Sequence, residues 1–210
     1  MPRTLRLSPA HVLVLALLAA LLTAGAVLAW RIANAREPID WSQARSIEPL
    51  ELSEFELVDL DGAAFGDAEL RGRVWLLDFV SLQCSACGPT SGALADLQAA
   101  LAREDIGFVT VALSCDDGPG ALRSHQRSYR RADPARWRIL LADREYVPRL
   151  AVQLGVAASE RHVLAGLVAP RPRFFLIDRE ARVRGAYDAR RASELAWLVA
   201  DANALADEPR

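Results

Sequence analysis

The most informative part of this sequence is "VWLLDFVSLQCSACGPTSG", residues Val74 to Gly92. An apolar run that contains one acid, Asp78, leads into two cysteines with C-x-x-C spacing, Cys84 and Cys87. Apolar residues at helical spacing follow the cysteines. The pattern indicates a buried strand that passes into a helix, with the cysteine pair at the junction. Such a pair can be a redox couple, a metal clamp or a structural crosslink.

The spacing and position of the two cysteines favour redox chemistry. On the first turn of a helix, residues i and i+3 lie on one face, where two sulfurs can form a disulfide. The N–H groups of a helix N-terminus also stabilise a thiolate. We expect Cys84 to be the attacking thiolate and Cys87 to resolve the mixed disulfide. A structural crosslink closing so short a loop would contribute little stability. Zinc is disfavoured because the chain has three cysteines, three histidines and no second C-x-x-C.

The remainder of the chain predicts an α/β domain over residues 50–207, because strands and helices alternate along it. We expect strands at 73–80, 106–113 and 136–143, and helices at 91–104, 118–132, 144–155 and 191–206. Hairpins are predicted at 55–70 and 173–188, and a loop at 156–171.

The N-terminal region predicts a membrane anchor. Val12 to Trp30 contains no charged residue and, at about 1.5 Å per residue, is long enough to cross about 30 Å of hydrocarbon. Arg3 and Arg6 in the segment 1–11 favour a cytoplasmic N-terminus, and residues 31–49 read as a tether. The motif at 33–35 resembles a signal-peptide cleavage site, so a cleaved leader is the alternative. Either interpretation places the domain on the periplasmic or extracytoplasmic side, where disulfides form.

The composition excludes several function classes. The sequence contains no lysine, which rules out Schiff-base chemistry and a Walker-type phosphate loop. Its arginines are spread among 27 acidic residues, for a net charge of -2, so we expect no nucleic-acid partner.

The segment "VWLLDFVSLQCSAC" resembles the thioredoxin superfamily, and "RPRFFLID" is similar to the superfamily's cis-proline region. More of the chain, from about residue 50 to 205, is similar to the Sco/SenC family, through "LRGRVWLLDFV", "FVTVAL", "ADPARWRILLADRE" and "FLIDREARVRGAYD". These resemblances imply a thioredoxin-like fold, a central mixed sheet flanked by helices. They also imply a protein thiol or disulfide partner and a role in assembling the copper centre of cytochrome c oxidase, with an oxidase subunit as the suggested partner.

The resemblance also assigns roles to single residues. Asp78 would accept a proton from Cys87, and the alternative is a rim carboxylate paired with an arginine. Arg171 and Pro172 would shape the groove for the partner, with Pro172 as the cis-proline. The family binds copper through C-x-x-x-C-P and a distant histidine, whereas this chain has C-x-x-C, and the family's histidine position falls near Pro170.

A copper site would therefore use Cys84, Cys87 and His162, the one histidine in that neighbourhood, which we place on the loop. The hypotheses are a thiol-disulfide oxidoreductase without a required cofactor, a copper metallochaperone, and a structural module whose Cys84–Cys87 disulfide never turns over. Cys115 is expected at the same sheet edge, as a small buried residue or a third thiol. His125 is expected at the surface.

Overall fold

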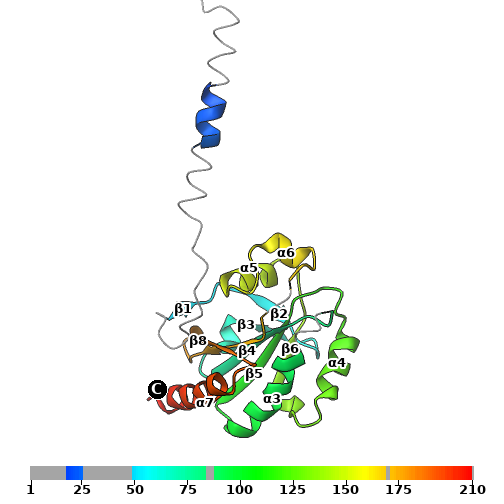
Figure 1. Ribbon diagram of the computed structural model, residues 1–210, viewed down its shortest axis with the longest axis vertical. Helices are drawn as coiled ribbons and strands as arrows, with labels where there is room; N and C mark the ends of the chain where they lie inside the picture. Colours follow the sequence, from blue (N-terminus) through cyan, green and yellow to red (C-terminus); the bar gives the residue numbers. More distant parts are fainter. Residues whose placement is uncertain (1–17, 26–48, 84–87, 169–170, 210) are drawn as a thin grey trace, which may run out of the picture. The chain divides into compact units, whose positions relative to one another are not determined.

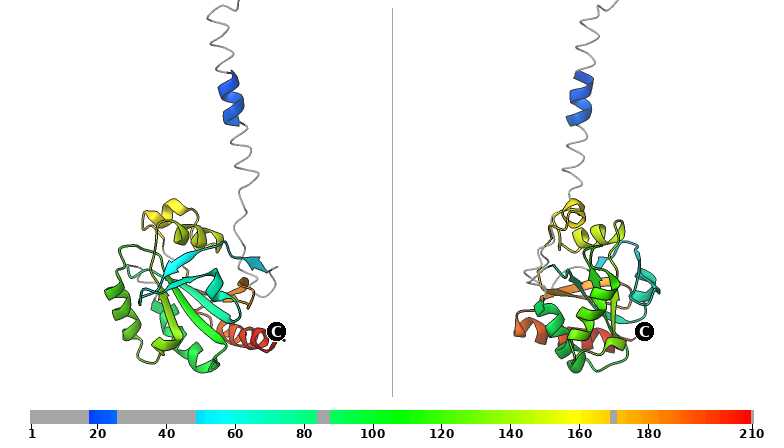
Figure 2. Two further views of the ribbon diagram at one scale, coloured as in Figure 1. Left: turned by 180° about the vertical axis from the view of Figure 1, so that it is seen from behind. Right: turned by 90° about the vertical axis from the view of Figure 1, so that its right-hand side faces the viewer.

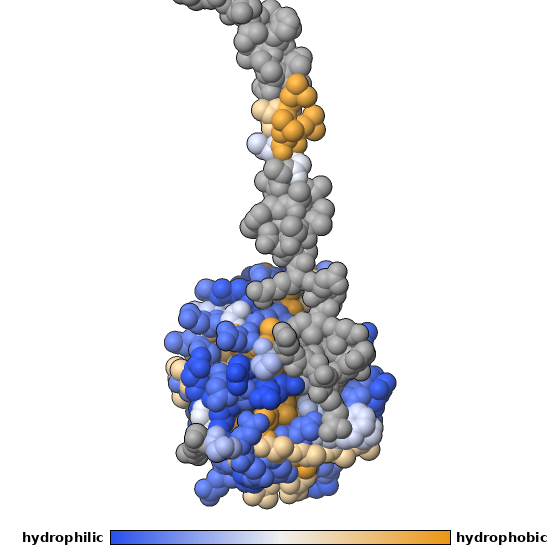
Figure 3. All heavy atoms as spheres, turned by 90° about the vertical axis from the view of Figure 1, so that its left-hand side faces the viewer, coloured by the Kyte–Doolittle hydropathy of each residue, from blue (hydrophilic) through white to orange (hydrophobic). Residues whose placement is uncertain are grey.

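The computed structural model describes residues 18–25, 49–83, 88–168 and 171–209. The chain divides into two compact units, Met1–Pro38 and Ile39–Arg210. In the first unit, residues 18–25 form a helix that is largely apolar (Figure 3). Within the described residues, no helix combines the length and apolar character that a membrane crossing requires. The predicted anchor extends over residues 12–30, of which 12–17 and 26–30 lie outside the described residues, so the anchor stays a prediction.

The described part of the second unit is built on a mixed six-stranded sheet (Figure 1). In spatial order its strands are β1 (Leu50–Glu51), β8 (Arg182–Asp188), β7 (Arg173–Ile177), β4 (Val74–Val80), β5 (Ile106–Ala112) and β6 (Trp137–Leu140). Strands β4, β5 and β6 are parallel, whereas β7 is antiparallel to β4, and β8 is antiparallel to both β7 and β1. The predicted early hairpin is confirmed as β2 (Glu56–Val58) and β3 (Ala64–Gly66).

Helices and the hairpin cover both faces of the sheet, which gives three layers (Figures 1 and 2). The helices are α2 (Asp67–Leu70), α3 (Gly88–Ala100), α4 (Pro119–Ser128), α5 (Tyr146–Gln153), α6 (Glu160–Leu164) and α7 (Ala192–Asp207), and a 3₁₀ turn spans Pro134–Arg136. Helices α3, α4 and α7 contribute to the hydrophobic core on one face. Helices α2, α5 and α6 and the β2–β3 hairpin contribute to the core on the other. This is the predicted thioredoxin-like α/β arrangement.

Strand β4 lies at the centre of the sheet and is buried along its whole length. Because successive strand residues point to opposite faces, Trp75, Leu77 and Phe79 enter the core beneath α5. Leu76 and Val80 enter the core beneath α3 and α7. The same alternation directs Asp78 toward the α3 side, so a carboxyl group is placed in an apolar layer.

Most predicted elements are found, with differences at their ends. Helix α3 begins at Gly88 rather than residue 91, and α4 ends at Ser128 rather than at 132. The prediction of a plain loop over 156–171 is wrong, because α6 forms within it and buries Val163 in the core. A helix of one turn is too short to give a periodic signal in the sequence.

Candidate functional site

One edge of the sheet collects the segments that sequence analysis singled out. Strands β4, β5 and β6 are parallel, so their carboxyl ends meet at this edge, and the antiparallel β7 begins there. The cysteine pair follows β4, Cys115 follows β5, and Arg171 and Pro172 precede β7. The sulfurs themselves cannot be placed, because Cys84 and Cys87 lie outside the described residues. Their roles stay predictions.

Asp78 is buried inside the domain, with 1 % of its surface exposed. Its Oδ1 accepts a short hydrogen bond from the hydroxyl of Thr110, which lies opposite it on β5. Burial raises the pKa of the Asp78 carboxyl to about 7, and the Thr110 hydrogen bond partly opposes this rise. The alternative of a rim carboxylate paired with an arginine is wrong, since no arginine among the described residues pairs with Asp78.

Thr110 is itself held by a second strand. Trp137, at the start of β6, donates from its indole Nε1 to Thr110 Oγ1 over 2.8 Å. Both side chains are buried, and so the three polar groups of Trp137, Thr110 and Asp78 form a continuous chain across β6, β5 and β4. A polar chain of this kind in an apolar layer is stable because each buried group has a partner.

His125 on helix α4 lies between these hydrogen-bonded side chains and helix α3. The expectation that His125 lies at the surface is wrong: the ring is half-buried, and Nε2 lies 3.0 Å from the hydroxyl of Ser91 on α3. The ring of His125 also packs edge-on against those of Tyr129 and Trp137. Burial lowers the pKa of His125, with the charge of Asp117 acting in the opposite direction, so the neutral imidazole is favoured.

Asp117 fixes the loop that leads to the cysteine pair. Its carboxylate Oδ2 accepts a hydrogen bond of 3.0 Å from the backbone N–H of Leu82, two residues before Cys84. The side chain of Asp117 is buried, whereas its neighbour Asp116 is exposed. The loops after β4 and β5 are thereby joined at the edge of the sheet.

A hollow of about 200 Å³ opens at the same edge. Gln83, the residue before Cys84, lines it from the segment that follows β4, and Cys115 lines it from the segment that follows β5. Asp143 and Arg144 contribute from the loop after β6, and residues 163–166 from α6 and its C-terminal turn. Cys115 is an exposed free thiol, so the expectation that it is a small buried residue is wrong.

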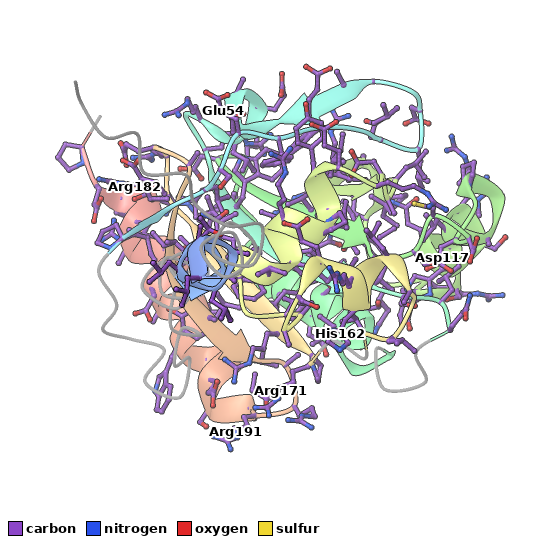
Figure 4. All side chains as sticks on the ribbon, turned by 90° about the horizontal axis from the view of Figure 1, so that it is seen from above. Glu54, Asp117, His162, Arg171, Arg182 and Arg191 are labelled. Atoms are coloured by element: carbon purple, nitrogen blue, oxygen red, sulfur yellow. The ribbon has the colours of Figure 1, made fainter. Side chains whose placement is uncertain are left out.

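His162 lies on helix α6 rather than on a loop, and its side chain is exposed (Figure 4). The Nδ1 atom lies 2.6 Å from the Ser159 hydroxyl, which leaves Nε2 as the nitrogen available to another ligand. Among the described residues, no cluster of three or more His, Cys, Asp or Glu side chains is arranged to hold a metal ion. The copper assignment to Cys84, Cys87 and His162 therefore stays a prediction.

Arg171 and Pro172 lie side by side at the start of β7 but differ in exposure. Arg171 is exposed, whereas Pro172 is buried and its carbonyl accepts a hydrogen bond of 2.8 Å from Ala189 N. Within the described residues no peptide bond is cis, so the expected cis bond before Pro172 is not found. The partner-groove role of the two residues stays a prediction.

Comparison with known proteins assigns the family. The SCO1/SenC family model matches residues 44–201. The chain belongs to the SCO1/SenC family. Among curated proteins, no significant match is found.

Solved structures of the family share the fold of this SCO1/SenC chain. A SCO1/SenC family lipoprotein from Bacillus anthracis strain Ames is 26 % identical, with a TM-score of 0.65, over 76 % of this chain and 98 % of that one. BsSco, a Sco-family cytochrome c oxidase assembly protein in which a disulfide switch was identified, is 19 % identical, with a TM-score of 0.65, over 80 % and 100 %. Copper-bound ScoI from Bradyrhizobium japonicum is 16 % identical, with a TM-score of 0.58, over 74 % and 99 %.

No sequence pattern pointed to Thr110, Asp117 or Trp137 as residues of the site. Thr110 did leave a signal, because it is a polar residue inside the otherwise apolar run "IGFVTVAL", as Asp78 is inside "VWLLDFV". Only the register of β4 with β5 shows that the two polar residues lie opposite each other.

Proposed function

We propose that this protein is a thiol-disulfide oxidoreductase of the Sco/SenC type that serves assembly of the copper centre of cytochrome c oxidase. One observation carries the redox assignment: the strand that leads to the C-x-x-C pair holds a buried carboxyl group, Asp78, whose pKa is raised to about 7. A carboxyl group with a pKa near neutral can both take and return a proton under physiological conditions.

The proposed exchange uses three side chains. The thiolate of Cys84 attacks a partner disulfide, forms a mixed disulfide and releases the partner's first sulfur as a thiolate. Cys87 then transfers its thiol proton to Asp78, and the resulting thiolate attacks the sulfur of Cys84. The Cys84–Cys87 disulfide forms and the partner's second sulfur leaves as a thiolate. Two electrons pass to the partner, and an external thiol reductant restores the pair.

The family supplies the proposed purpose. BsSco, which shares the fold, is described as a cytochrome c oxidase assembly protein with a disulfide switch. A cytochrome oxidase subunit with cysteines that must be reduced before copper enters is therefore the proposed partner. Arg171 and Pro172, which lie at the sheet edge where β4 ends, are proposed to border its binding groove.

The proposed location follows from the sequence. Residues 12–30 would anchor the chain in the cell membrane by a single span, with the domain on the periplasmic side. An oxidising compartment suits a cysteine pair that cycles between thiol and disulfide.

Copper transfer is the second candidate function. The hollow at the sheet edge is lined both by Gln83, next to Cys84, and by residues of α6. Helix α6 carries His162, with Nε2 available. Two thiolates and an imidazole would suit Cu(I) as cargo. Copper-bound ScoI has the same fold and makes this candidate worth testing. A structural module whose disulfide never turns over is the third.

One set of measurements on the compact unit Ile39–Arg210 separates these functions. The reduction potential of the cysteine pair is obtained by equilibration with a dithiol buffer, and Cu(I) affinity by competition with a chromophoric chelator. The variants are Asp78→Asn, His162→Ala and, as an exposed control away from the hollow, Glu104→Gln. We expect a potential above about -300 mV and a disulfide-exchange rate that falls at least tenfold in Asp78→Asn alone.

The other results assign the other functions. Stoichiometric Cu(I) binding that is lost in His162→Ala would establish copper transfer through the proposed ligands. A potential below about -300 mV, without copper binding, would indicate an inert structural disulfide and would overturn the oxidoreductase proposal.

A further inference from the structure

We propose that Thr110 and Trp137 are positioning residues which hold Oδ1 of Asp78 as a fixed hydrogen-bond acceptor, so that Oδ2 takes and returns the proton. The functional purpose of this arrangement rests on the proposed thiol-disulfide exchange. The hydrogen bonds themselves are present whether or not that exchange takes place. The supporting observation is the pair of hydrogen bonds that links Trp137 on β6 to Thr110 on β5 and Thr110 to Asp78 on β4.

The direction of the two hydrogen bonds follows from the chemistry of the groups. An indole Nε1–H can only donate, so Trp137 donates to Thr110 Oγ1 at 2.8 Å. A threonine hydroxyl has a single proton, and because its oxygen is already an acceptor for Trp137, that proton points at Asp78 Oδ1. Trp137 thereby prevents Thr110 from turning its hydroxyl proton away from the carboxyl group.

The two oxygens of Asp78 are consequently not equivalent. Oδ1 faces a donor whether the carboxyl group is ionised or neutral, so a proton placed there would meet the hydroxyl proton of Thr110. The backbone N–H of Asp78 also donates to its own carboxyl group, and among the described residues no side chain donates to Oδ2. Proton exchange is therefore directed to Oδ2, and the Thr110 hydrogen bond stabilises the ionised form that exchange produces.

Packing against helix α4 fixes the indole ring that starts the chain. The ring centroid of Trp137 lies 6.5 Å from that of His125 and 6.3 Å from that of Tyr129. Gln126 donates from Nε2 to the Trp137 carbonyl over 2.8 Å. With 2 % of its surface exposed, the Trp137 side chain has little freedom to turn. The donor is thus held in place by two rings and a backbone contact.

Few ionisable side chains lie close to the hydrogen bonds that link Trp137, Thr110 and Asp78. His125 is the ionisable side chain that α4 presents to Trp137, and burial lowers its pKa against the influence of Asp117. On α7, which packs on the same face, Asp201 accepts a hydrogen bond from the hydroxyl of Tyr187. No charged side chain among the described residues contributes to the pKa of Asp78. Its hydrogen bonds and its burial therefore govern proton exchange there.

The test uses the full-length chain in detergent and two readouts. The first is the carboxyl titration of Asp78, observed by carbon-13 NMR of labelled aspartate and assigned by its loss in Asp78→Asn. The second is the pH profile of the exchange rate with a model disulfide. The variants are Thr110→Val, which removes the hydroxyl at nearly constant volume, Thr110→Ser as the matched control, and Trp137→Phe.

We expect Thr110→Val to move the Asp78 titration upward by about one pH unit, because the ionised form loses its donor. The part of the pH–rate profile for disulfide exchange that reports the ionisation of Asp78 should move by the same amount. Trp137→Phe should give a smaller shift in the same direction, and Thr110→Ser should titrate like the wild type. Thr110→Val still decides the question if Trp137→Phe fails to fold.

Three results would overturn the inference. An Asp78 titration that is unchanged in Thr110→Val excludes the hydrogen-bond chain, as does an equal shift in Thr110→Ser. If the Asp78 titration shifts but the pH profile of the exchange rate does not, the Trp137–Thr110 hydrogen bonds play no part in proton transfer. The failure of the proposed function looks different: the wild type would exchange no disulfide, while Asp78 would still titrate and shift as described.

Discussion

The backbone amide of Leu82 donates a 3.0 Å hydrogen bond to the carboxylate of Asp117, which joins the loop after β4 to the loop after β5. Leu82 stands two residues before Cys84, and Asp117 two residues after Cys115. The segment that leads into the cysteine pair is therefore anchored by a buried side chain from the neighbouring strand connection, although the two residues are 35 positions apart in sequence.

Replacing Asp117 should release this loop. In Asp117→Ala, the amide of Leu82 loses its acceptor, so we expect faster hydrogen exchange at Leu82 and a loss of about 1 to 2 kcal/mol in the free energy of unfolding. Asp117→Asn retains a carbonyl oxygen and should keep most of the protection. Asp116→Ala, at an exposed neighbour, is the control. Equal protection of Leu82 in Asp117→Ala and the wild type would contradict the anchoring role.

The pH dependence of stability should reveal the buried carboxyl group of Asp78. Its folded-state pKa, about 7, lies above the ordinary value of 3.8, so between these pH values the folded state holds a proton that the unfolded state has released. The free energy of unfolding should therefore fall as pH rises through this window, by up to about 4 kcal/mol at pH 8.

Comparison with Asp78→Asn isolates that contribution. The neutral variant keeps the acceptor for Thr110 and should lack the fall, so the two proteins should diverge in urea unfolding between pH 4 and pH 8. His125, whose pKa is lowered by burial, acts in the opposite direction, but it is present in both proteins and cancels in the difference. Parallel stability curves for the two proteins would show that Asp78 is not titrating as a buried acid.

Gly107 on β5 leaves room for the indole of Trp75 on β4. A Cβ at this position would overlap the six-membered part of the Trp75 ring, which packs edge-on against Phe65 with centroids 5.3 Å apart. Gly107→Ala should cost about 1 to 3 kcal/mol and lower the Tm by about 3 to 10 °C. Gly120→Ala on α4, where a Cβ meets open space, should leave the Tm unchanged or raise it, because alanine favours helix.

Cys115 should be a spectator in disulfide exchange. It lies in the hollow at the sheet edge as an exposed free thiol, without an assigned partner for exchange. With the Cys84–Cys87 pair oxidised, thiol titration should find one reactive group per chain, and none in Cys115→Ser. The exchange rate of Cys115→Ser should lie within about twofold of the wild type. A large loss of rate would instead make Cys115 a third participant.

The order of strands and helices around the cysteine pair could be predicted from the pattern of amino acids alone. Buried strands are recognisable in the sequence as apolar runs, as at Val74–Val80 and Ile106–Ala112, because both faces of a central strand exclude water. Asp78 could be picked out for the same reason, as the polar exception in such a run. The short helix α6 and the true ends of α3 could not be predicted from the sequence. Each depends on the packing of about one helical turn, which is too short to produce a periodic pattern.

The surroundings of Asp78, in contrast, arise from packing between segments that are distant in the sequence. The parallel register of β4 and β5 places Thr110 opposite it, and the start of β6 adds Trp137, residues that stand 32 and 59 positions further along the chain. Hydrogen bonds between strands depend on register, which no local pattern specifies. The same holds for His125 and Asp117, whose burial and partners arise where α4 and its preceding loop pack against β4 and α3.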